Sequence, residues 1–257
     1  MATTVNGARC PDHPSESLVY CGLCSSEILA SGDMEARARW QARIRNAECE
    51  ERFPLRFKSA QADNPDVEAW VQEWADNQTE CRSLLLSGPV GVGKTWQAYG
   101  ALRAAVTGAR PTTWIAVTSA DLYASLRPRT GHDTEAELER YRSAGLLLID
   151  DLGAAKASEW VEETTYRVLN GRYEDMRPSI FTTNLPTPAL KEAIGDRIAS
   201  RLAETCQRVV LEGGDRRRNA TLPTVPLPRP SEPDPEAARA AEREAERIRE
   251  QNEVLWR

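Results

Sequence analysis

Hydrophobic residues along the chain fall into short continuous runs, separated by longer stretches with helical spacing. The runs at 84–86 and 146–149 have the length of buried strands, and a third run lies within "RPSIFTTNLP". Helical spacing is clearest in the face formed by Val67, Trp70, Val71 and Trp74. This alternation of strands and helices is typical of an α/β fold.

The residues on either side of that region follow other patterns. Residues 33–52 are strongly charged and helix-forming, with Trp40 and Ile44 four positions apart, and predict a solvated connecting helix that Pro54 ends. After Ala220, "TLPTVPLPRPSEPDP" predicts an extended, semi-rigid linker. The final "EAARAAEREAERIREQNEVLWR" has high helix propensity and almost no apolar face, which predicts a solvated helix or a disordered tail.

Composition limits the class of protein. A chain of 257 residues with 40% hydrophobic residues can bury one full domain and carry smaller flanks. A net charge of -6 argues against a surface devoted wholly to nucleic acid, although it permits a local basic groove. No apolar run approaches the roughly 20 residues that span a bilayer, and "MATTVNGARC" lacks the layout of a secretory signal. We therefore expect a cytoplasmic protein without a membrane partner.

Cysteine residues near the N-terminus form one chemical candidate. The ligand set Cys10, His13, Cys21 and Cys24 has the spacing C-x2-H-x7-C-x2-C, which suits a closed, tetrahedral zinc site. A segment this short has no other means of folding. The set resembles B-box and treble-clef-like modules, and the alternative is an unstructured N-terminus with incidental cysteines. The remaining cysteines are expected to be ordinary thiols: Cys49, Cys81 and Cys206.

The stretch "GPVGVGKT" carries the strongest motif. It satisfies the P-loop pattern G-x-x-x-x-G-K-[ST], and it lies between a predicted strand and a predicted helix, as that motif requires. Backbone N–H groups of the loop would surround phosphates, Lys94 would reach the terminal phosphates, and Thr95 would hold magnesium. The candidate nucleotide-binding residues are Gly88, Pro89, Val90, Gly91, Val92, Gly93, Lys94 and Thr95.

Acidic and amide side chains follow two later strands. Asp150 and Asp151 end the run at 146–149 in a Walker B pattern, in which Asp150 would hold magnesium and Asp151 would orient or deprotonate the attacking water. Thr183 and Asn184 end the next strand, where Asn184 would contact the γ-phosphate or the water. Simple capping and turn chemistry is the alternative for both pairs.

Four blocks in order resemble the DnaC and IstB group of AAA+ ATPases, which includes bacterial and phage helicase loaders: "LLLSGPVGVGKTWQAYGAL", "LLLIDDLGAAKASEW", "YRVLNGRYEDMRPSIFTTNL" and "GDRIASRL". The resemblance covers roughly residues 50–220. It implies a five-stranded parallel sheet in the order 5-1-4-3-2, with helices on both faces. It also implies ATP and Mg²⁺ as cofactors, besides the Zn²⁺ of the N-terminal module.

The same resemblance suggests roles for arginines. Arg201 resembles the arginine finger that acts on ATP bound by a neighbouring subunit, with Arg197 as the alternative, and Arg217 resembles sensor 2, with Arg218 as the alternative. Residues 112–145 would supply the second strand and the helices that face single-stranded DNA in the loaders. Candidates there are Arg127, Arg129, Arg140 and Arg142 for phosphates and Tyr123 and Tyr141 for base stacking.

Together these features divide the chain into a zinc-binding module at 1–32, a charged connecting helix at 33–60, an AAA+ ATPase domain at 61–220, a Pro-rich linker at 221–235 and a charged helical tail at 236–257. Because Asp151 is shorter than the glutamate common in AAA+ enzymes, hydrolysis is expected to be slow. It is also expected to depend on assembly or DNA.

The expected function is that of a DnaC-like helicase loader in DNA replication. It would self-associate into an AAA+ oligomer, bind a replicative and hexameric helicase, and assist its deposition on single-stranded DNA in a bacterial or phage-infected cell. Two alternatives stay open. One is an IstB-like, ATP-dependent transposition helper, and the other is a non-catalytic, nucleotide-gated adaptor that recruits a partner through the zinc module.

Overall fold

The structure is a computed structural model that describes residues 33–108 and 112–216. The chain divides into two compact units, Met1–Arg218 and Asn219–Arg257, and all described residues belong to the first. Several predictions therefore concern residues outside the described part and stay predictions: the zinc ligands Cys10, His13, Cys21 and Cys24, the arginines Arg217 and Arg218, the linker and the tail.

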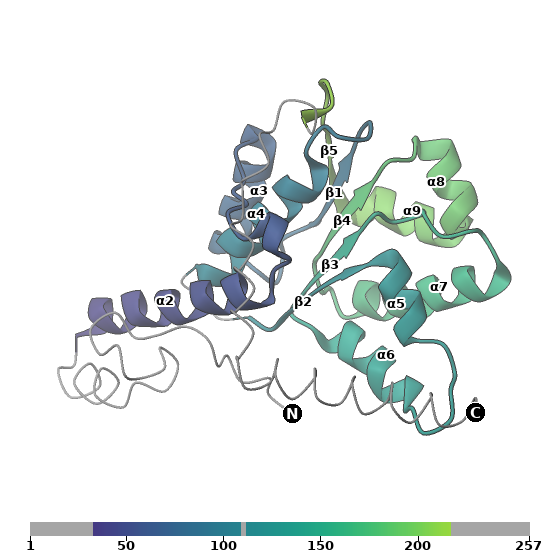
Figure 1. Cartoon of the computed structure of the whole chain (residues 1–257), viewed down its shortest axis with the longest axis horizontal. Coiled ribbons are helices and arrows are strands. Elements are labelled where there is room, and N and C mark those ends of the chain that lie inside the picture. The colour runs from purple at the N-terminus through teal and green to yellow at the C-terminus, as the bar shows by residue number, and fades with distance from the viewer. Residues whose placement is uncertain (1–32, 109–111, 217–257) are drawn as a thin grey trace, which may run out of the picture. The chain divides into compact units, whose positions relative to one another are not determined.

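A parallel sheet of five strands forms the centre of the described domain (Figure 1). Its strands are β1 (Ser83–Ser87), β2 (Trp114–Thr118), β3 (Leu146–Asp150), β4 (Ser179–Thr183) and β5 (Cys206–Val210). They are ordered β2-β3-β4-β1-β5, and every neighbouring pair is parallel. The predicted order 5-1-4-3-2 is thus confirmed, and the sheet matches the AAA+ P-loop fold.

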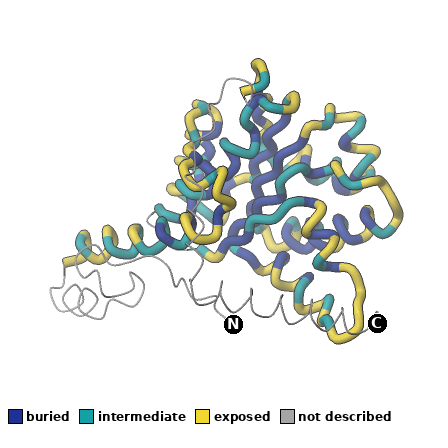
Figure 2. Tube along the Cα trace, viewed as in Figure 1, coloured by how far each residue is buried: buried dark blue, intermediate teal, exposed yellow. Residues whose placement is uncertain are grey.

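Helices cover both faces of the sheet. On one face lie α2 (Met34–Arg52), α3 (Pro65–Asp76) and α4 (Lys94–Thr107), and on the other lie α5 (Ser119–Ser125), α6 (Thr134–Ser143), α7 (Glu159–Glu174), α8 (Thr187–Ile194) and α9 (Asp196–Thr205) (Figure 1). Successive strand residues alternate between the two cores: Leu84 and Leu86 face the first group, and Leu85 faces the second. Strands buried on both faces explain their continuous apolar runs (Figure 2).

Helix α3 shows how local sequence and packing agree. Asn64 caps it by accepting hydrogen bonds from the backbone N–H groups of Asp66 and Val67, and Pro65 occupies its first turn. The predicted apolar face is confirmed, because Val67, Trp70 and Trp74 are buried. The indole N–H groups of the two tryptophans donate to the backbone carbonyls of Arg82 and Ala105, so their burial leaves no polar atom without a partner.

The charged helix α2 is joined to this core along its last turns. Cys49 is fully buried, and Phe53, which follows the helix, packs edge-on against Tyr99 and Trp114. Arg45 donates to the carbonyl of Gly108, which ties the middle of the helix to the end of α4. Helix α2 ends before Pro54, as predicted, and Pro54 is followed by a single 3-10 turn, η1 (Leu55–Phe57). None of the described helices is long and apolar enough to cross a membrane.

Arg172 on α7 fixes the amino-terminal edge of the sheet. Its guanidinium is buried and donates to the carbonyls of Tyr141, Arg142, Ala144 and Pro178 and to the Ser179 hydroxyl. Burial, with a smaller contribution from Arg177, lowers the pKa of Arg172 to about 9, so the side chain stays charged near neutral pH. One arginine thus connects α6, α7 and the start of β4, and leaves the carboxyl edge to the candidate site.

Candidate nucleotide site

The loop 88–95 turns from the end of β1 into α4. Gly91 and Gly93 have φ angles of 88° and 101°, in the left-handed region that favours glycine. Gly93 is also the N-cap of α4, so the loop ends where the first N–H groups of the helix have no partners within the helix. These groups and the positive end of the helix dipole make the loop a site for anions.

Lys94 folds its side chain back into this loop. The Nζ atom donates to the carbonyl oxygens of Gly88, at 2.9 Å, and Pro89, at 2.7 Å. The residue is only 6% exposed. Phosphate oxygens are stronger acceptors for an ammonium than peptide carbonyls are. The position of Lys94 therefore fits its predicted role of meeting phosphates that enter the loop.

Thr95 meets Asp150 across the edge of the sheet. The Thr95 hydroxyl donates to Asp150 Oδ1 at 2.9 Å, and the Thr182 hydroxyl donates to the same oxygen at 2.6 Å. Because Thr95 gives its proton to the carboxylate, its lone pairs are available to a cation. Burial, and to a lesser extent the charge of Asp150, raises the pKa of Tyr99 to about 12, so this nearby phenol stays neutral.

The residues present fit Mg²⁺. Thr95 and Asp150 offer hard oxygen atoms side by side, and Mg²⁺ typically takes one or two protein oxygens together with waters and substrate phosphates. Within the described ranges there is no group of three or more His, Cys, Asp or Glu side chains that could hold a metal alone. The site is thus of the kind in which phosphates supply part of the coordination.

Asp151 is held in an uncommon backbone conformation beside Asn184. Its φ of 61° places it in the left-handed region, which a non-glycine residue rarely adopts. The Asn184 amide donates to Asp151 Oδ1 at 2.5 Å. The Ser119 hydroxyl donates to the Asp151 carbonyl at 2.8 Å, and the Asp151 N–H donates to the Thr182 hydroxyl at 2.8 Å. The structure therefore brings together Asp150, Asp151 and Asn184, as the sequence predicted.

The segment 211–216, after β5, crosses the loop. The N–H of Arg216 donates to the carbonyl of Gly91 at 2.9 Å, and the Asp215 side chain lies against the Cα of Gly91. A Cβ atom on Gly93 would lie 3.5 Å from the Arg216 side chain. The predicted sensor 2 residues, Arg217 and its alternative Arg218, lie outside the described residues, and Arg216 was not among the predicted site residues. No local pattern in the sequence gives this contact, because it depends on the strand register: Leu211 N–H donates to Ser87 O and continues the β5–β1 pairing up to the loop.

Arg201 lies away from this loop, at a cavity of about 460 Å³ whose lining includes Ser83 and Ser179, the first residues of β1 and β4. Its guanidinium packs over the rings of Tyr166 and Tyr173, at 5.2 Å and 4.9 Å, and its Nη1 is buried without a hydrogen-bond partner among the described residues.

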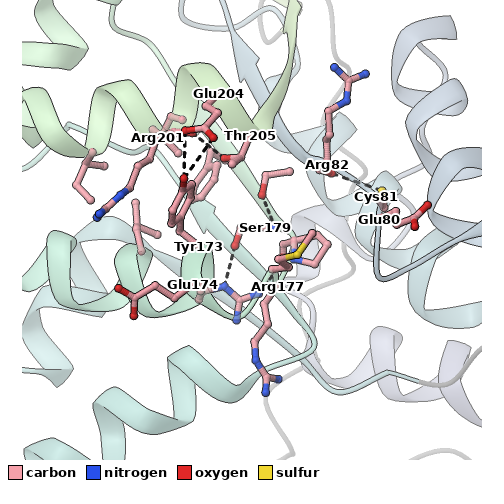
Figure 3. A pocket seen from close by; sticks show the side chains of 18 of the residues that line it. Glu80, Cys81, Arg82, Tyr173, Glu174, Arg177, Ser179, Arg201, Glu204 and Thr205 are labelled. Atoms are coloured by element: carbon pink, nitrogen blue, oxygen red, sulfur yellow. Dashed lines mark hydrogen bonds between the residues drawn. The ribbon is translucent and has the colours of Figure 1, made fainter.

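Figure 3 shows that the guanidinium groups of Arg82, Arg177 and Arg201 point in different directions, so they do not converge on one ligand. Arg197, one turn earlier on α9, is exposed. Neither Arg197 nor Arg201 lines the nucleotide loop of its own chain among the contacts described. The choice between them as a finger for a neighbouring subunit stays a prediction.

The expected DNA-facing segment forms strand β2 and helices α5 and α6. Arg127 packs over the Trp160 ring at 4.9 Å, and Arg129 is exposed. Arg140 pairs with Glu137 at 2.7 Å, and Arg142 lies 3.8 Å from Glu139. Of these predicted phosphate contacts, the last two are thus partly neutralised by acidic residues on the same helix.

The prediction that Tyr123 and Tyr141 stack on bases is wrong. Their side chains are 4% and 3% exposed, and they belong to the core between the sheet and α7. The Tyr123 hydroxyl bonds with Thr165 at 2.8 Å, and the Tyr141 hydroxyl bonds with Ser125 at 3.0 Å. Both rings are needed to fill the interior, because α5 and α6 are short and supply few other large apolar side chains.

Comparison with known proteins agrees with the fold and the loop. A sequence profile of the IstB-like ATP binding protein family matches residues 36–222, more than half of the chain. The insertion sequence ATP-binding protein y4pL of Sinorhizobium fredii is 32% identical over 153 residues, which make up 57% of this chain and 60% of that protein. The chain therefore spans less than two thirds of this relative's length.

Solved structures with the same fold include the DnaC helicase loader and DnaI. The DnaC helicase loader superposes with a TM-score of 0.55 at 23% identity, over 62% of this chain and 100% of that chain. DnaI superposes with a TM-score of 0.53 at 19% identity, over 64% of this chain and 94% of that chain. At such identities the likeness concerns the fold alone.

Proposed function

The chain belongs to the IstB-like ATP-binding protein family, and we propose that it hydrolyses ATP and, in its ATP state, delivers a replicative DNA helicase onto single-stranded DNA. The observation that carries the ATPase part is the connected set of side chains at the carboxyl edge of the sheet. Thr95 meets Asp150, and Asn184 meets Asp151. A loop that only held phosphates would need neither the second carboxylate nor its amide partner.

Each residue has a separate task in this proposal. The loop N–H groups and Lys94 hold the phosphates, and Thr95 and Asp150 hold Mg²⁺, which neutralises phosphate charge when bound. Asp151 accepts a proton from the attacking water or orients it, and Asn184 keeps the Asp151 carboxylate turned toward the reacting edge. The shorter reach of an aspartate is consistent with slow turnover, which suits a timed switch more than a motor.

A complete site also needs positive charge at the γ-phosphate, and we assign it to α9 of a neighbouring subunit. Arg201 is the first candidate, and it would have to leave its packing against Tyr166 and Tyr173 to reach that phosphate. Arg197 is the second, because it is already exposed on the same helix. In either case assembly would switch on hydrolysis, as arginine fingers do elsewhere.

Two kinds of partner protein are candidates for the client, the protein on which this ATPase acts. Likeness in fold to the DnaC helicase loader, over 100% of that solved chain, supports a helicase. Likeness at 32% identity to an insertion sequence ATP-binding protein supports a transposition helper that acts with a transposase on duplex DNA. In both cases the predicted zinc module at Cys10, His13, Cys21 and Cys24 would recruit the client. The zinc module is tested by measuring the zinc content of the full chain. We expect the Cys21→Ser variant to bind less zinc than wild type.

The ATPase proposal is tested with Asp151→Asn. The variant keeps the shape of the side chain but cannot accept a proton, so we expect ATP binding to stay within about twofold of wild type while phosphate release falls about a hundredfold. Binding is followed with a fluorescent ATP analogue, and release with a phosphate assay. If wild type and variant release phosphate equally, or neither does, the protein is a nucleotide-gated adaptor and the ATPase proposal is wrong.

The shared site is tested by mixing two inactive variants. Lys94→Ala should not bind ATP but retains α9, and Arg201→Ala should bind ATP but lacks the finger. Each alone should be inactive, and an equimolar mixture should recover part of the wild-type rate, because one subunit then supplies what the other lacks. Repeating the mixture with Arg197→Ala identifies the finger. A mixture that stays inactive in both series contradicts a finger acting between subunits.

The client is tested by two assays run with the same protein. A loader should increase helicase-dependent unwinding of single-stranded circles coated with binding protein, and this effect should require ATP. A transposition helper should increase strand transfer by a cognate transposase and leave the helicase unaffected. Lys94→Ala serves as the control in both assays. Stimulation of the transposase alone would replace the helicase proposal with the second candidate.

A further inference from the structure

Thr182, on β4, touches both aspartates of the candidate site with one hydroxyl group. Asp151 N–H donates to Thr182 Oγ1 at 2.8 Å, and Thr182 Oγ1 donates to Asp150 Oδ1 at 2.6 Å. The direction of both bonds is set by chemistry, because the amide can only donate and the carboxylate can only accept. The hydroxyl therefore links the two aspartates by accepting one hydrogen bond from Asp151 and donating one to Asp150.

This link determines where the Asp150 carboxylate can offer an oxygen. Oδ1 accepts hydrogen bonds from both Thr95 and Thr182. Two donors on one oxygen restrict rotation of the carboxyl group and leave the other oxygen as the one available to a cation or its water. The orientation of Asp150 is thus set from two sides. Thr95, at the start of α4, holds it from one side, and Thr182, on β4, holds it from the other.

Thr182 also holds the turn that follows β3. Its hydroxyl accepts from the N–H of Asp151, and its carbonyl accepts from the N–H of Leu152 at 2.7 Å. The two bonds hold the peptide groups before and after the Asp151 Cα, the residue whose φ is left-handed. Without the first bond, the N–H of Asp151 would lose its partner beside a residue that is only 2% exposed.

We propose that Thr182 is a positioning residue of the nucleotide site, which sets the metal-side carboxylate of Asp150 and the backbone of Asp151 through one hydroxyl. The inference rests on the proposed ATPase function. A central, buried strand position would accept valine equally well for shape. Among the described residues the hydroxyl forms hydrogen bonds only with the two aspartates, so its role lies in the site and not in filling the core.

The test compares Thr182→Val, which removes the hydroxyl at nearly constant shape, with Thr182→Ser, which keeps it. The matched control is Thr165→Val, because Thr165 is a buried threonine on α7 whose hydroxyl bonds with Val161 O and Tyr123 outside the site. Three quantities are measured on the full chain: the rate of phosphate release, the Mg²⁺ dependence of binding of a fluorescent ATP analogue, and the same binding in EDTA.

Loss of a group that orients a metal ligand typically costs about 10- to 100-fold, so Thr182→Val should lower the rate and raise the Mg²⁺ concentration for half-maximal binding by about tenfold or more. Binding in EDTA should change by no more than about twofold, since the loop and Lys94 are untouched. Thr182→Ser should stay within about threefold of wild type, because it keeps the hydroxyl that links the two aspartates. Thr165→Val should leave the rate and the Mg²⁺ dependence unchanged.

Two results would overturn the inference. One is a Thr182→Val variant with wild-type Mg²⁺ dependence, and the other is a Thr182→Ser variant as impaired as Thr182→Val, which would show that shape alone matters. Failure of the ATPase proposal is distinguishable, because it appears as equal phosphate release by wild type and Asp151→Asn. In that event the Mg²⁺ dependence of binding still decides whether Thr182 positions Asp150.

Discussion

The left-handed backbone at Asp151 predicts an unusual order of stability among its variants. An ordinary side chain in this region costs about 1–2 kcal/mol, whereas glycine has no such cost but loses about 0.5–1 kcal/mol through the entropy of its unfolded chain. Both Asp151→Ala and Asp151→Gly lose the hydrogen bond from Asn184, so that loss cancels between them. The free energy of unfolding of the glycine variant should therefore be about 1 kcal/mol higher than that of the alanine variant.

Thermal unfolding without nucleotide measures the difference. For a domain of this size, about 1 kcal/mol corresponds to about 2–4 °C in Tm. Both variants should be equally inactive in phosphate release, because each lacks the carboxylate. Stability and catalysis at one position are thus separated: the backbone favours glycine, and the chemistry requires aspartate.

Met176 provides a positive control. It has a φ of 52°, is 69% exposed and lies in the turn between α7 and β4, outside the candidate site. Met176→Gly should raise the free energy of unfolding by about 1 kcal/mol without changing phosphate release. If this gain is seen while Asp151→Ala is as stable as Asp151→Gly, the left-handed conformation of Asp151 and the argument built on it are refuted.

Three further predictions concern the loop, the core and the thiols. Gly91→Ala should weaken ATP binding by about tenfold, because the φ of 88° at this position is strained for alanine and the added Cβ would displace Asp215. The control Gly214→Ala should bind ATP normally, because a Cβ there has no atom within 4 Å. Arg172→Met should lower the free energy of unfolding by about 3–5 kcal/mol in urea titrations, because it leaves buried carbonyls without donors, against less than about 1 kcal/mol for Arg177→Met. Burial raises the pKa of the thiols of Cys49, Cys81 and Cys206 to about 12, so near pH 8 these thiols should resist iodoacetamide until guanidinium unfolds the chain. Because their ordinary pKa is 9.0, the free energy of unfolding should fall as the pH rises above 9.0. Fast alkylation of these three thiols in the folded protein would contradict the prediction.

Much of the fold and half of the site follow from patterns within a few neighbouring residues. The glycine loop between strand and helix, the aspartates after β3 and Asn184 after β4 were all predicted because each motif is local. The parallel sheet then brings them together, since the carboxyl ends of neighbouring strands share one edge. The sheet order itself came from the resemblance to a family, and neither periodicity nor composition would have supplied it.

Predictions failed where partners are distant in sequence. Tyr123 and Tyr141 looked like stacking residues because they stand among arginines, yet they fill a core whose other members lie on α7 and the sheet. Arg216 was not predicted as a site residue, because only the continued β5–β1 pairing shows that it reaches Gly91. Its neighbours Arg217 and Arg218 lie outside the described residues.

The sequence by itself determined that the chain folds as alternating strands and helices and that it carries a phosphate loop and two aspartates at strand ends. These properties depend on the spacing of residues within one helical turn or one strand, so a short stretch of sequence is enough to predict them. Only the tertiary structure decided that Thr182 connects Asp150 with Asp151, and that Arg201 packs against Tyr166 and Tyr173. Such contacts join residues about 30 or more positions apart, and they arise only when strand order and helix packing place those residues side by side.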